Sequence, residues 1–136
     1  MPEAFILRPM TKDDEGFVYR AWLEGYWQHC PESAYMPKSE WFCRWHRVIE
    51  RLLEAEATQV QVAHVENQPD VLLGFACATL GVLHWAYVKQ TFRGLGVAQS
   101  LISALALEER ACSHWAPHLA SAAFTYRPGI LKEILR

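Results

Sequence analysis

The chain has 136 residues, of which 51% are hydrophobic, and it carries a formal net charge of −2. This length suits one domain over residues 1–136 with a real apolar core, and the composition excludes a disordered chain. The 13 basic and 15 acidic residues form no basic stripe, so we expect no nucleic acid partner.

The sequence also gives no sign of a membrane or of a metal site. No apolar run approaches the roughly 18 residues needed to span a bilayer, and the N-terminus lacks the layout of a signal peptide. The four cysteines are widely spaced, as is typical of free thiols in a reducing compartment. We therefore expect a soluble cytoplasmic protein with no membrane partner. Cys43 and His46 have a metal-ligand spacing, but no second pair lies nearby, so we expect no metal.

The first third of the chain predicts a strand, a helix and a loop. Residues 5–8 form a short apolar strand. Thr11 followed by Asp14 is typical of a helix N-cap with an acidic first turn, and apolar residues at helical spacing carry this helix to about Trp27. Residues 28–37 contain two prolines and are expected to form a loop.

A strongly amphipathic helix and a series of strands follow. The second helix covers residues 39–57, beginning at Ser39. Residues 59–62 alternate glutamine and valine, as in a half-exposed strand, and two apolar strands follow over residues 71–80 and 82–88. Gly74 marks a bulge or a close approach of two backbones within its strand.

The last third begins with the glycine-containing stretch VKQTFRGLGVA, residues 88–98. A third helix is expected over residues 96–110, then a strand over 118–126 and a short helix over 128–136. The apolar face of the third helix comprises Leu101, Ala104 and Leu105. The order β α α β β β α β α predicts an α/β (α+β) layered domain, with a mixed, mostly antiparallel central sheet flanked by helices.

Two glycines directly before a helix suggest a phosphate site, and three designs compete. A P-loop needs Lys-Ser or Lys-Thr after its last glycine, whereas Val97 follows Gly96 here. A dinucleotide fingerprint needs Gly or Ala where this chain has Gln99. The third pattern, Arg-x-x-Gly-x-Ala, is complete from Arg93 to Ala98. It offers a fixed positive charge and backbone N–H groups at a helix start, which suit a pyrophosphate. A simple tight turn is the alternative.

This stretch resembles the acetyl-CoA site of the GNAT (GCN5-related N-acetyltransferase) superfamily. The resemblance rests on Phe92-Arg93-Gly94-x-Gly96, on the strand end Tyr87-Val88, on Leu73-Gly74-Phe75 and on Ile6 to Thr11. It covers roughly residues 4–125, with the elements in matching order. It implies a GNAT-like fold and a transferase that moves an acetyl group from acetyl-CoA to a primary amine of a small molecule or peptide.

The resemblance also implies where the cofactor lies. CoA would occupy a V-shaped gap between the strands at 82–88 and 118–126, with its pantetheine arm paired to the backbone of Tyr87 and Val88 like an added strand. The pyrophosphate would rest on the loop. The loop residues implied in cofactor binding are Arg93, Gly94, Leu95, Gly96, Val97 and Ala98.

Catalysis needs a base for the ammonium proton, a donor to the thioester carbonyl and an acid for the thiolate. The resemblance makes the N–H near Val88 the donor. His84 is the candidate base, directly or through a water, because strand alternation places it on one face with Ala86 and Val88. A structural histidine bonded to a neighbouring strand is the alternative. The expected tyrosine is missing from the last helix, which leaves Tyr126 as candidate acid.

The resemblance implies an acceptor pocket between the first two helices, where Trp27, His29 and Tyr35 would form an aromatic wall. Ordinary packing of this loop is the alternative. Residues 1–68 hold seven basic and eleven acidic residues, which favours a cationic amine. The chain ends at Arg136, where the family continues with further strands, so a shortened or truncated member is expected. A catalytically weak CoA-binding or structural module is therefore the alternative function, and a homodimer is compatible with the sequence.

Overall fold

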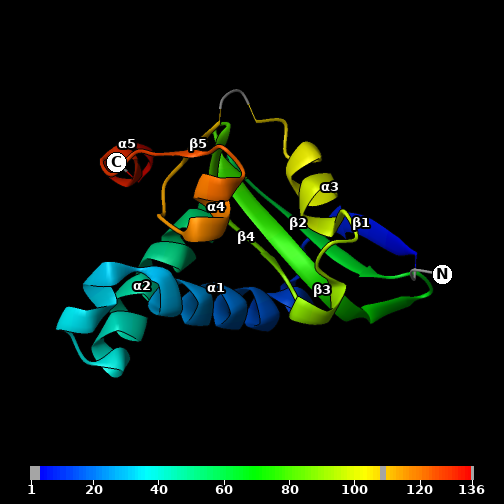
Figure 1. Cartoon of the computed structure of the whole chain (residues 1–136), viewed down its shortest axis with the longest axis horizontal. Helices are drawn as coiled ribbons and strands as arrows, with labels where there is room; N and C mark the ends of the chain where they lie inside the picture. The colour runs from blue at the N-terminus through cyan, green and yellow to red at the C-terminus, as the bar shows by residue number, and fades with distance from the viewer. Residues whose placement is uncertain (1–3, 108–109, 136) are drawn as a thin grey trace.

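The structure of the chain, a computed structural model, describes residues 4–107 and 110–135. A six-stranded sheet runs through this part in the order β1-β2-β3-β4-β5-β6 (Figure 1). The first four strands pair antiparallel, whereas β4–β5 and β5–β6 pair parallel. The sheet is therefore mixed and mostly antiparallel, as predicted. The strands are β1 Phe5–Pro9, β2 Thr58–Val65, β3 Gln68–Thr79, β4 Val82–Val88, β5 Ala111–Cys112 and β6 Thr125–Tyr126.

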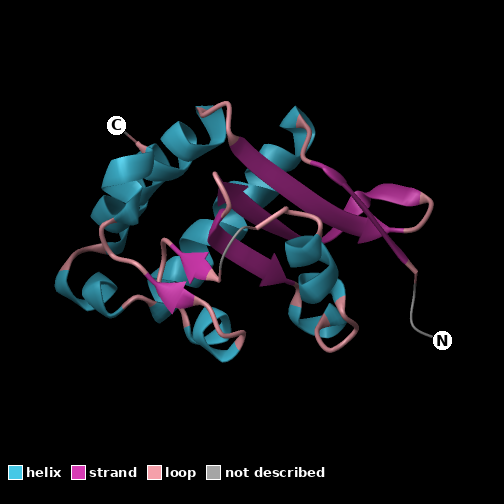
Figure 2. Cartoon of the chain, turned by 90° about the horizontal axis from the view of Figure 1, so that it is seen from above, coloured by secondary structure: helices cyan, strands magenta, loops and turns pink. Residues whose placement is uncertain are grey.

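Helices lie on both sides of the sheet (Figure 2). On one side, Phe17 and Trp22 of α1 place their ring centroids 6.2 Å from that of Phe75 on β3. The α-helices are α1 Glu15–His29, α2 Lys38–Glu54, α3 Val97–Ser103, α4 Pro117–Ser121 and α5 Ile130–Ile134. Short 3-10 turns are η1 Lys12–Asp14, η2 Pro31–Tyr35 and η3 Gln90–Phe92.

The predicted cap of the first helix also connects that helix to the sheet. Asp14 accepts a hydrogen bond from the backbone N–H of Thr11 at 2.8 Å, and its carboxylate pairs with Arg8 of β1 at 2.6 Å. The hydrogen bond from Arg8, helped by those from Thr11, lowers the pKa of the Asp14 carboxyl despite its burial. The cap thus fixes the angle at which the chain leaves β1 and enters α1.

The core side of α2 matches the predicted amphipathic stripe. Trp41, Ile49 and Leu52 are buried, while charged residues cover the opposite face. The helix begins at Lys38 and ends at Glu54, three residues before the predicted end. Burial of this stripe against α1 and the sheet supplies the apolar driving force that a helix of this length needs.

Gly74 allows β3 and β4 to approach closely, as predicted. A Cβ atom added at this glycine would lie 2.3 Å from the carbonyl oxygen of Tyr87. That oxygen belongs to the backbone of the neighbouring strand and cannot rotate away. Any side chain at position 74 would therefore force the two strands apart beside the glycine-containing stretch 88–98, the glycine loop.

The prediction for the third helix was wrong at its C-terminal end. The helix stops at Ser103 instead of Arg110, and its last turn tightens, with the N–H of Leu105 bonded to the carbonyl of Ile102. Leu105 is buried as expected, but Ala104 is exposed. The turn carries Leu105 into the core, a tertiary gain that overrides the helix propensity of the following residues. Residues 108–109 of the predicted helix lie outside the described residues.

The predicted strand over residues 118–126 was also wrong. Its first half is the helix α4, which begins with Pro117, a residue favoured in the first turn of a helix. Only Thr125 and Tyr126 form a strand, and they pair with β5 rather than with β4. The neighbour of β4 is β5, which was not predicted because two residues are too few to show a period.

The contact at Gly74 leads to a testable prediction. Gly74→Ala should lower the free energy of unfolding by about 3 kcal/mol, because the added methyl group overlaps the Tyr87 carbonyl oxygen. Gly16→Ala is the control, since nothing lies within 4 Å of its added Cβ atom in α1. Helix propensity should make that variant more stable by up to about 1 kcal/mol. Urea unfolding measures both, and equal stability of the two variants would contradict the close approach.

Candidate active site

The strands β4 and β5 form a fork. They share one paired position, Leu83 with Cys112, and the N–H of Ser113 donates to the carbonyl of Leu83 at 3.0 Å. From there β4 continues to Val88, while the segment that follows β5 turns away into α4. The gap therefore lies between β4 on one side and β5 with α4 on the other, which corrects the boundary expected from the sequence.

A β-bulge at His84 decides which way the end of β4 faces. Cys77 of β3 pairs with Trp85, but the next residue, Ala78, pairs with Leu83, so His84 is the extra residue. A bulge shifts the alternation of side chains along the strand. His84 consequently packs toward α1, with its ring centroid 6.3 Å from that of Trp22, instead of sharing a face with Ala86. The prediction from simple alternation was wrong for this reason.

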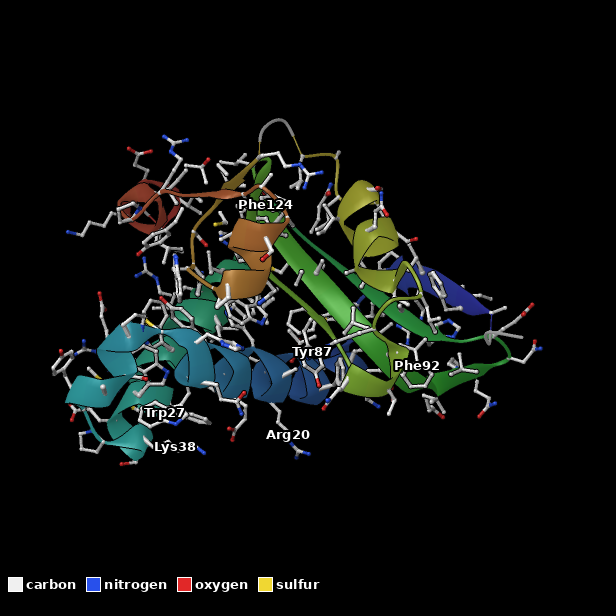
Figure 3. All side chains as sticks on the ribbon, in the orientation of Figure 1. Arg20, Trp27, Lys38, Tyr87, Phe92 and Phe124 are labelled. Carbon is white, nitrogen blue, oxygen red and sulfur yellow. The ribbon has the colours of Figure 1, made fainter. Side chains whose placement is uncertain are left out.

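The same shift decides which backbone groups are open along the end of β4, where β5 no longer pairs with it. The N–H of Lys89 donates to Leu73 of β3 at 2.8 Å. In an antiparallel pair, alternate residues face the partner strand, so Tyr87 also faces β3, while Ala86 and Val88 turn their backbone groups into the gap. Tyr87 lies on β4 just before the glycine loop that carries Phe92 (Figure 3). The backbone of Val88, as expected, and that of Ala86, in place of Tyr87, can pair with an added strand.

Two side chains cap the carbonyl groups of this open edge. His118 of α4 bonds through Nε2 to the carbonyl oxygen of Ala86 at 2.9 Å. Arg93 donates from Nε to the carbonyl oxygen of Val88, also at 2.9 Å, which leaves its two terminal nitrogens free of any other described bond. The side chains of His118 and Arg93 therefore lie beside the gap, at the two carbonyl groups of β4 that face it.

The glycine loop has the geometry of an anion cradle. Gly94 and Gly96 both have left-handed backbones, with φ of 84° and 82°, a conformation that other residues adopt only with strain. Nothing lies within 4 Å of a Cβ atom built at either position. The N–H groups of residues 97–99 begin α3 and have no partner inside the helix. The fixed positive charge, open space and unpaired donors fit a pyrophosphate, so these residues suit CoA.

His84 is enclosed at the apex of the fork. Its side chain is 0% exposed, Nδ1 lies 2.6 Å from the hydroxyl of Ser113, and Nε2 lies 2.8 Å from that of Thr79. Burial lowers the pKa of His84 to about 4. An imidazole with both nitrogens engaged does not face an acceptor, so this geometry favours the structural alternative. A catalytic role for His84 stays a prediction.

The histidine belongs to a longer buried chain of hydrogen bonds. The hydroxyl of Thr79 lies 2.7 Å from that of Thr58 on β2, and Ser113 lies 2.8 Å from Nδ1 of His114. Burial, reinforced by His84, holds the pKa of His114 well below its usual range. The chain thus runs across three strands, from β2 to the segment after β5, and ties the fork together with neutral groups.

The candidate acceptor residues separate into two groups. His29, at the C-terminal end of α1, is exposed, and its ring centroid lies 6.1 Å from that of His118, so it borders the gap. Trp27 instead packs edge-to-face on Trp41 of α2, at 5.8 Å, and lies at the end of α1 remote from Phe92 (Figure 3). Tyr35 is 88% exposed on η2. Only His29 is brought to the gap, and the substrate roles of all three stay predictions.

Tyr126 lies on the edge strand β6 and is 39% exposed. Partial burial raises the pKa of its hydroxyl, with smaller contributions from Glu32 and Cys30. These contributions place Tyr126 on the side of η2. Its role as acid stays a prediction. His118, which no spacing in the sequence marked as a site residue, lies against β4 through its bond to the carbonyl oxygen of Ala86.

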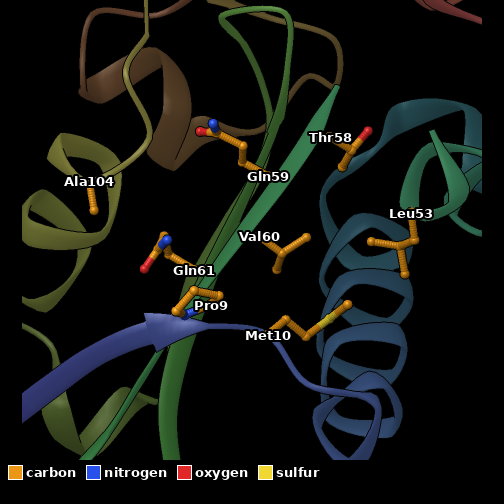
Figure 4. Close-up of a pocket in the computed structure, with 8 residues that line it drawn as sticks. All are labelled: Pro9, Met10, Leu53, Thr58, Gln59, Val60, Gln61 and Ala104. Atoms are coloured by element: carbon orange, nitrogen blue, oxygen red, sulfur yellow. The ribbon is translucent and has the colours of Figure 1, made fainter. Parts of the chain in front are cut away.

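A cavity of about 420 Å³ lies elsewhere, at the sheet edge where β1 ends (Figure 4). Thr58 and Gln59 of β2, Leu53 of α2 and Ala104 beyond α3 border it. None of the expected site residues lines this cavity, and none of its lining residues is charged. It is therefore separate from the fork and unsuited to an ionic ligand.

Comparisons with known proteins identify the fold. No family profile and no curated protein sequence matches the chain. Among solved structures, it is similar to aminoglycoside N-acetyltransferase AAC(6')-Iy in complex with CoA, at 20% identity and a TM-score of 0.52, over 93% of this chain and 90% of that one. The chain has the GNAT fold.

Two further GNAT structures agree with this identification. A GCN5-related N-acetyltransferase from Rhodopseudomonas palustris matches at 19% identity and a TM-score of 0.54, over 77% of this chain and 66% of that one. A glucosamine N-acetyltransferase region of a fungal multi-domain β-N-acetylglucosaminidase matches at 19% and 0.50, over 77% of this chain but only 12% of that protein. Among the described residues, no helix is long and apolar enough to span a membrane.

The buried imidazoles predict a loss of stability in mild acid. Because the folded-state pKa of His84, about 4, lies below the ordinary value of 6.5, the folded protein binds fewer protons than the unfolded chain. Its stabilising contribution is therefore complete above pH 6.5 and is lost as the pH falls toward 4. His114 and His118, whose pKa values are also lowered, act in the same direction.

Urea unfolding at pH 7 and pH 4.5 measures this effect. His84→Gln should reduce the difference between the two pH values by about 2 kcal/mol, because pH 4.5 lies well below the ordinary pKa of 6.5 but still above the folded-state pKa of about 4. His46→Gln, which removes an exposed imidazole from α2, is the control and should keep the parent's difference. An unchanged difference in His84→Gln would contradict a neutral, enclosed imidazole at the fork.

Proposed function

We propose that this GNAT-fold chain is an acetyl-CoA-dependent N-acyltransferase that moves an acetyl group to a primary amine of a small molecule or peptide. The observation that carries the proposal is the open edge of β4 leading directly into the glycine loop. One element offers strand-like hydrogen bonds at Ala86 and Val88, and the next offers an anion cradle. That pairing suits a ligand with an amide-containing arm attached to a pyrophosphate.

Acetyl-CoA, when bound, supplies the activated acetyl group as a thioester. Its pyrophosphate would rest on residues 93–98, after the end of β4. The pantetheine arm would then run back along Val88 and Ala86, which directs the thioester toward the fork. In this arrangement the N–H of Val88 lies along the arm and is the candidate donor to the thioester carbonyl. His84 and Tyr126 are the candidates that the sequence supplies for proton transfer.

The acceptor would enter from the side where His29 of α1 approaches α4. Glu32, which neighbours Tyr126, adds a carboxylate on this side and favours a cationic amine. Two proteins of similar fold are described as acting on amino sugars, as glucosamine and aminoglycoside N-acetyltransferases. Amino sugars are therefore natural first probes, and a lysine amide represents the amine of a peptide.

Cofactor binding gives the first test. Acetyl-CoA should raise the melting temperature of the parent protein, and the double variant Arg93→Ala with Gly96→Trp should abolish the shift. The first change removes a phosphate charge, and the second fills the open space of the cradle. Arg20→Ala with Gly129→Trp is the matched control, because it removes an exposed arginine and adds a tryptophan at an open glycine elsewhere.

The control variant should keep the parent's shift. Calorimetric titration with CoA, done on the same three proteins, checks that the thermal shift reports binding. Equal CoA affinity in the cradle variant and the parent would mean that the loop is a tight turn alone.

Turnover gives the second test. Release of the CoA thiol from acetyl-CoA should accelerate in the presence of glucosamine, neamine or lysine amide, and mass spectrometry should show the acetylated amine. Binding of CoA without thiol release for any of these amines would favour the CoA-binding module over the enzyme.

A further inference from the structure

His118 is held at the open edge of β4 in one orientation. Its Nε2 lies 2.9 Å from the carbonyl oxygen of Ala86, and its ring stands at 85° to that of Trp85, with centroids 5.1 Å apart. A carbonyl oxygen only accepts hydrogen bonds, so Nε2 must carry the hydrogen. The neutral ring then has its lone pair on Nδ1, for which no partner exists among the described residues.

The surroundings keep this lone pair available near neutral pH. Partial burial lowers the pKa of His118, although the Ala86 carbonyl opposes that effect. The other titratable groups that face it, His29 from α1 and Arg93 from the loop, lower the pKa further. Trp85 of β4 adds an apolar wall. The imidazole of His118 is therefore neutral near neutral pH, and its Nδ1 can accept a proton.

The position of His118 matches the reacting end of the cofactor. A pantetheine arm that leaves residues 93–98 and pairs with Val88 reaches Ala86 next, where the His118 ring stands. His29 approaches the same ring from the acceptor side, at 6.1 Å between centroids. By contrast, His84 lies deeper, at the apex of the fork, and both of its ring nitrogens are hydrogen-bonded to hydroxyl groups.

We propose that His118 is the general base of the acetyl transfer, with the Ala86 carbonyl fixing its tautomer. This inference rests on the function proposed above. Nδ1 takes one proton from the ammonium group of the acceptor. The resulting amine forms a C–N bond to the thioester carbon, and the C–S bond breaks with its electron pair on sulfur. The nitrogen then loses a second proton, which neutralises the thiolate, and the imidazolium returns its proton to solvent.

His118→Ala tests the proposal, with whichever of glucosamine, neamine and lysine amide the parent acetylates fastest. The variant should lose on the order of 100-fold in kcat, the usual contribution of a general base, while its CoA affinity stays within about twofold. The parent's kcat/KM should rise with pH through an ionisation below that of an ordinary histidine, and the variant should lack this limb. Added imidazole should restore part of the variant's rate.

His46→Ala, an exposed histidine on α2, is the matched control and should keep the parent's rate and pH profile. Recovery of rate with imidazole distinguishes a missing base from a structural defect, because a displaced α4 would not respond to it. If His118→Ala binds CoA and keeps the parent's rate and profile, the inference is overturned and the proposed function stands. If the parent itself binds CoA but acetylates none of the three amines, the proposed function fails first, and the inference with it.

Discussion

The site depends on one constraint, the point at which β4 stops pairing with β5. The bulge at His84 turns the backbone groups of Ala86 and Val88 away from β3, and β5 ends before it could pair with them. Without the bulge, Ala86 and Val88 would bond to β3, and Trp85 and Tyr87 would turn their backbone groups toward the gap instead. Without the early end of β5, a strand would fill the gap. The open edge of β4 is therefore a consequence of sheet geometry, and the side chains around it cap an edge that the backbone has already opened.

An open strand edge invites pairing with other chains, and natural sheets protect such edges. Here the carbonyl groups of Ala86 and Val88 are capped by His118 and Arg93, the side chains proposed above as general base and phosphate partner. The same residues thus shield the edge in the free protein and contact the ligand in the proposed complex. A carbonyl oxygen has two lone pairs, so the carbonyl oxygens of Ala86 and Val88 can accept a second hydrogen bond from a cofactor arm while His118 and Arg93 stay in place.

The sequence was informative wherever a local pattern had a physical cause within a few residues. The cap at Thr11 and Asp14, the stripe of α2, the limits of β4 and the role of Gly74 follow from capping chemistry, helical period, apolar runs and backbone clearance. It failed where the cause was tertiary. β5 is two residues long, and the bulge that turns His84 inward arises from the register between two strands. For the same reason no pattern in the sequence assigned His118 a role in the site, because its proximity to Ala86 joins positions 32 residues apart.

The buried hydrogen-bond chain explains why charge stays at the mouth of the fork and not at its apex. Each hydroxyl donates one hydrogen, so the chain from Thr58 to His114 must run in a single direction. At its far end, Nε2 of His114 is buried without a hydrogen-bond partner among the described residues, and the ring centroids of Tyr26 and Trp45 lie 4.7 and 5.2 Å away. An N–H group is accommodated against aromatic faces better than a bare lone pair, since those faces are electron-rich. This favours donation from Thr58 toward His114, which places the hydrogen of His84 on Nδ1 and makes Nε2 accept from Thr79. A proton added to His84 would reverse a bond in this chain and leave a charge in the core, so the apex stays neutral while His29, His118 and Arg93 carry the titratable and charged groups where solvent and substrate can reach them.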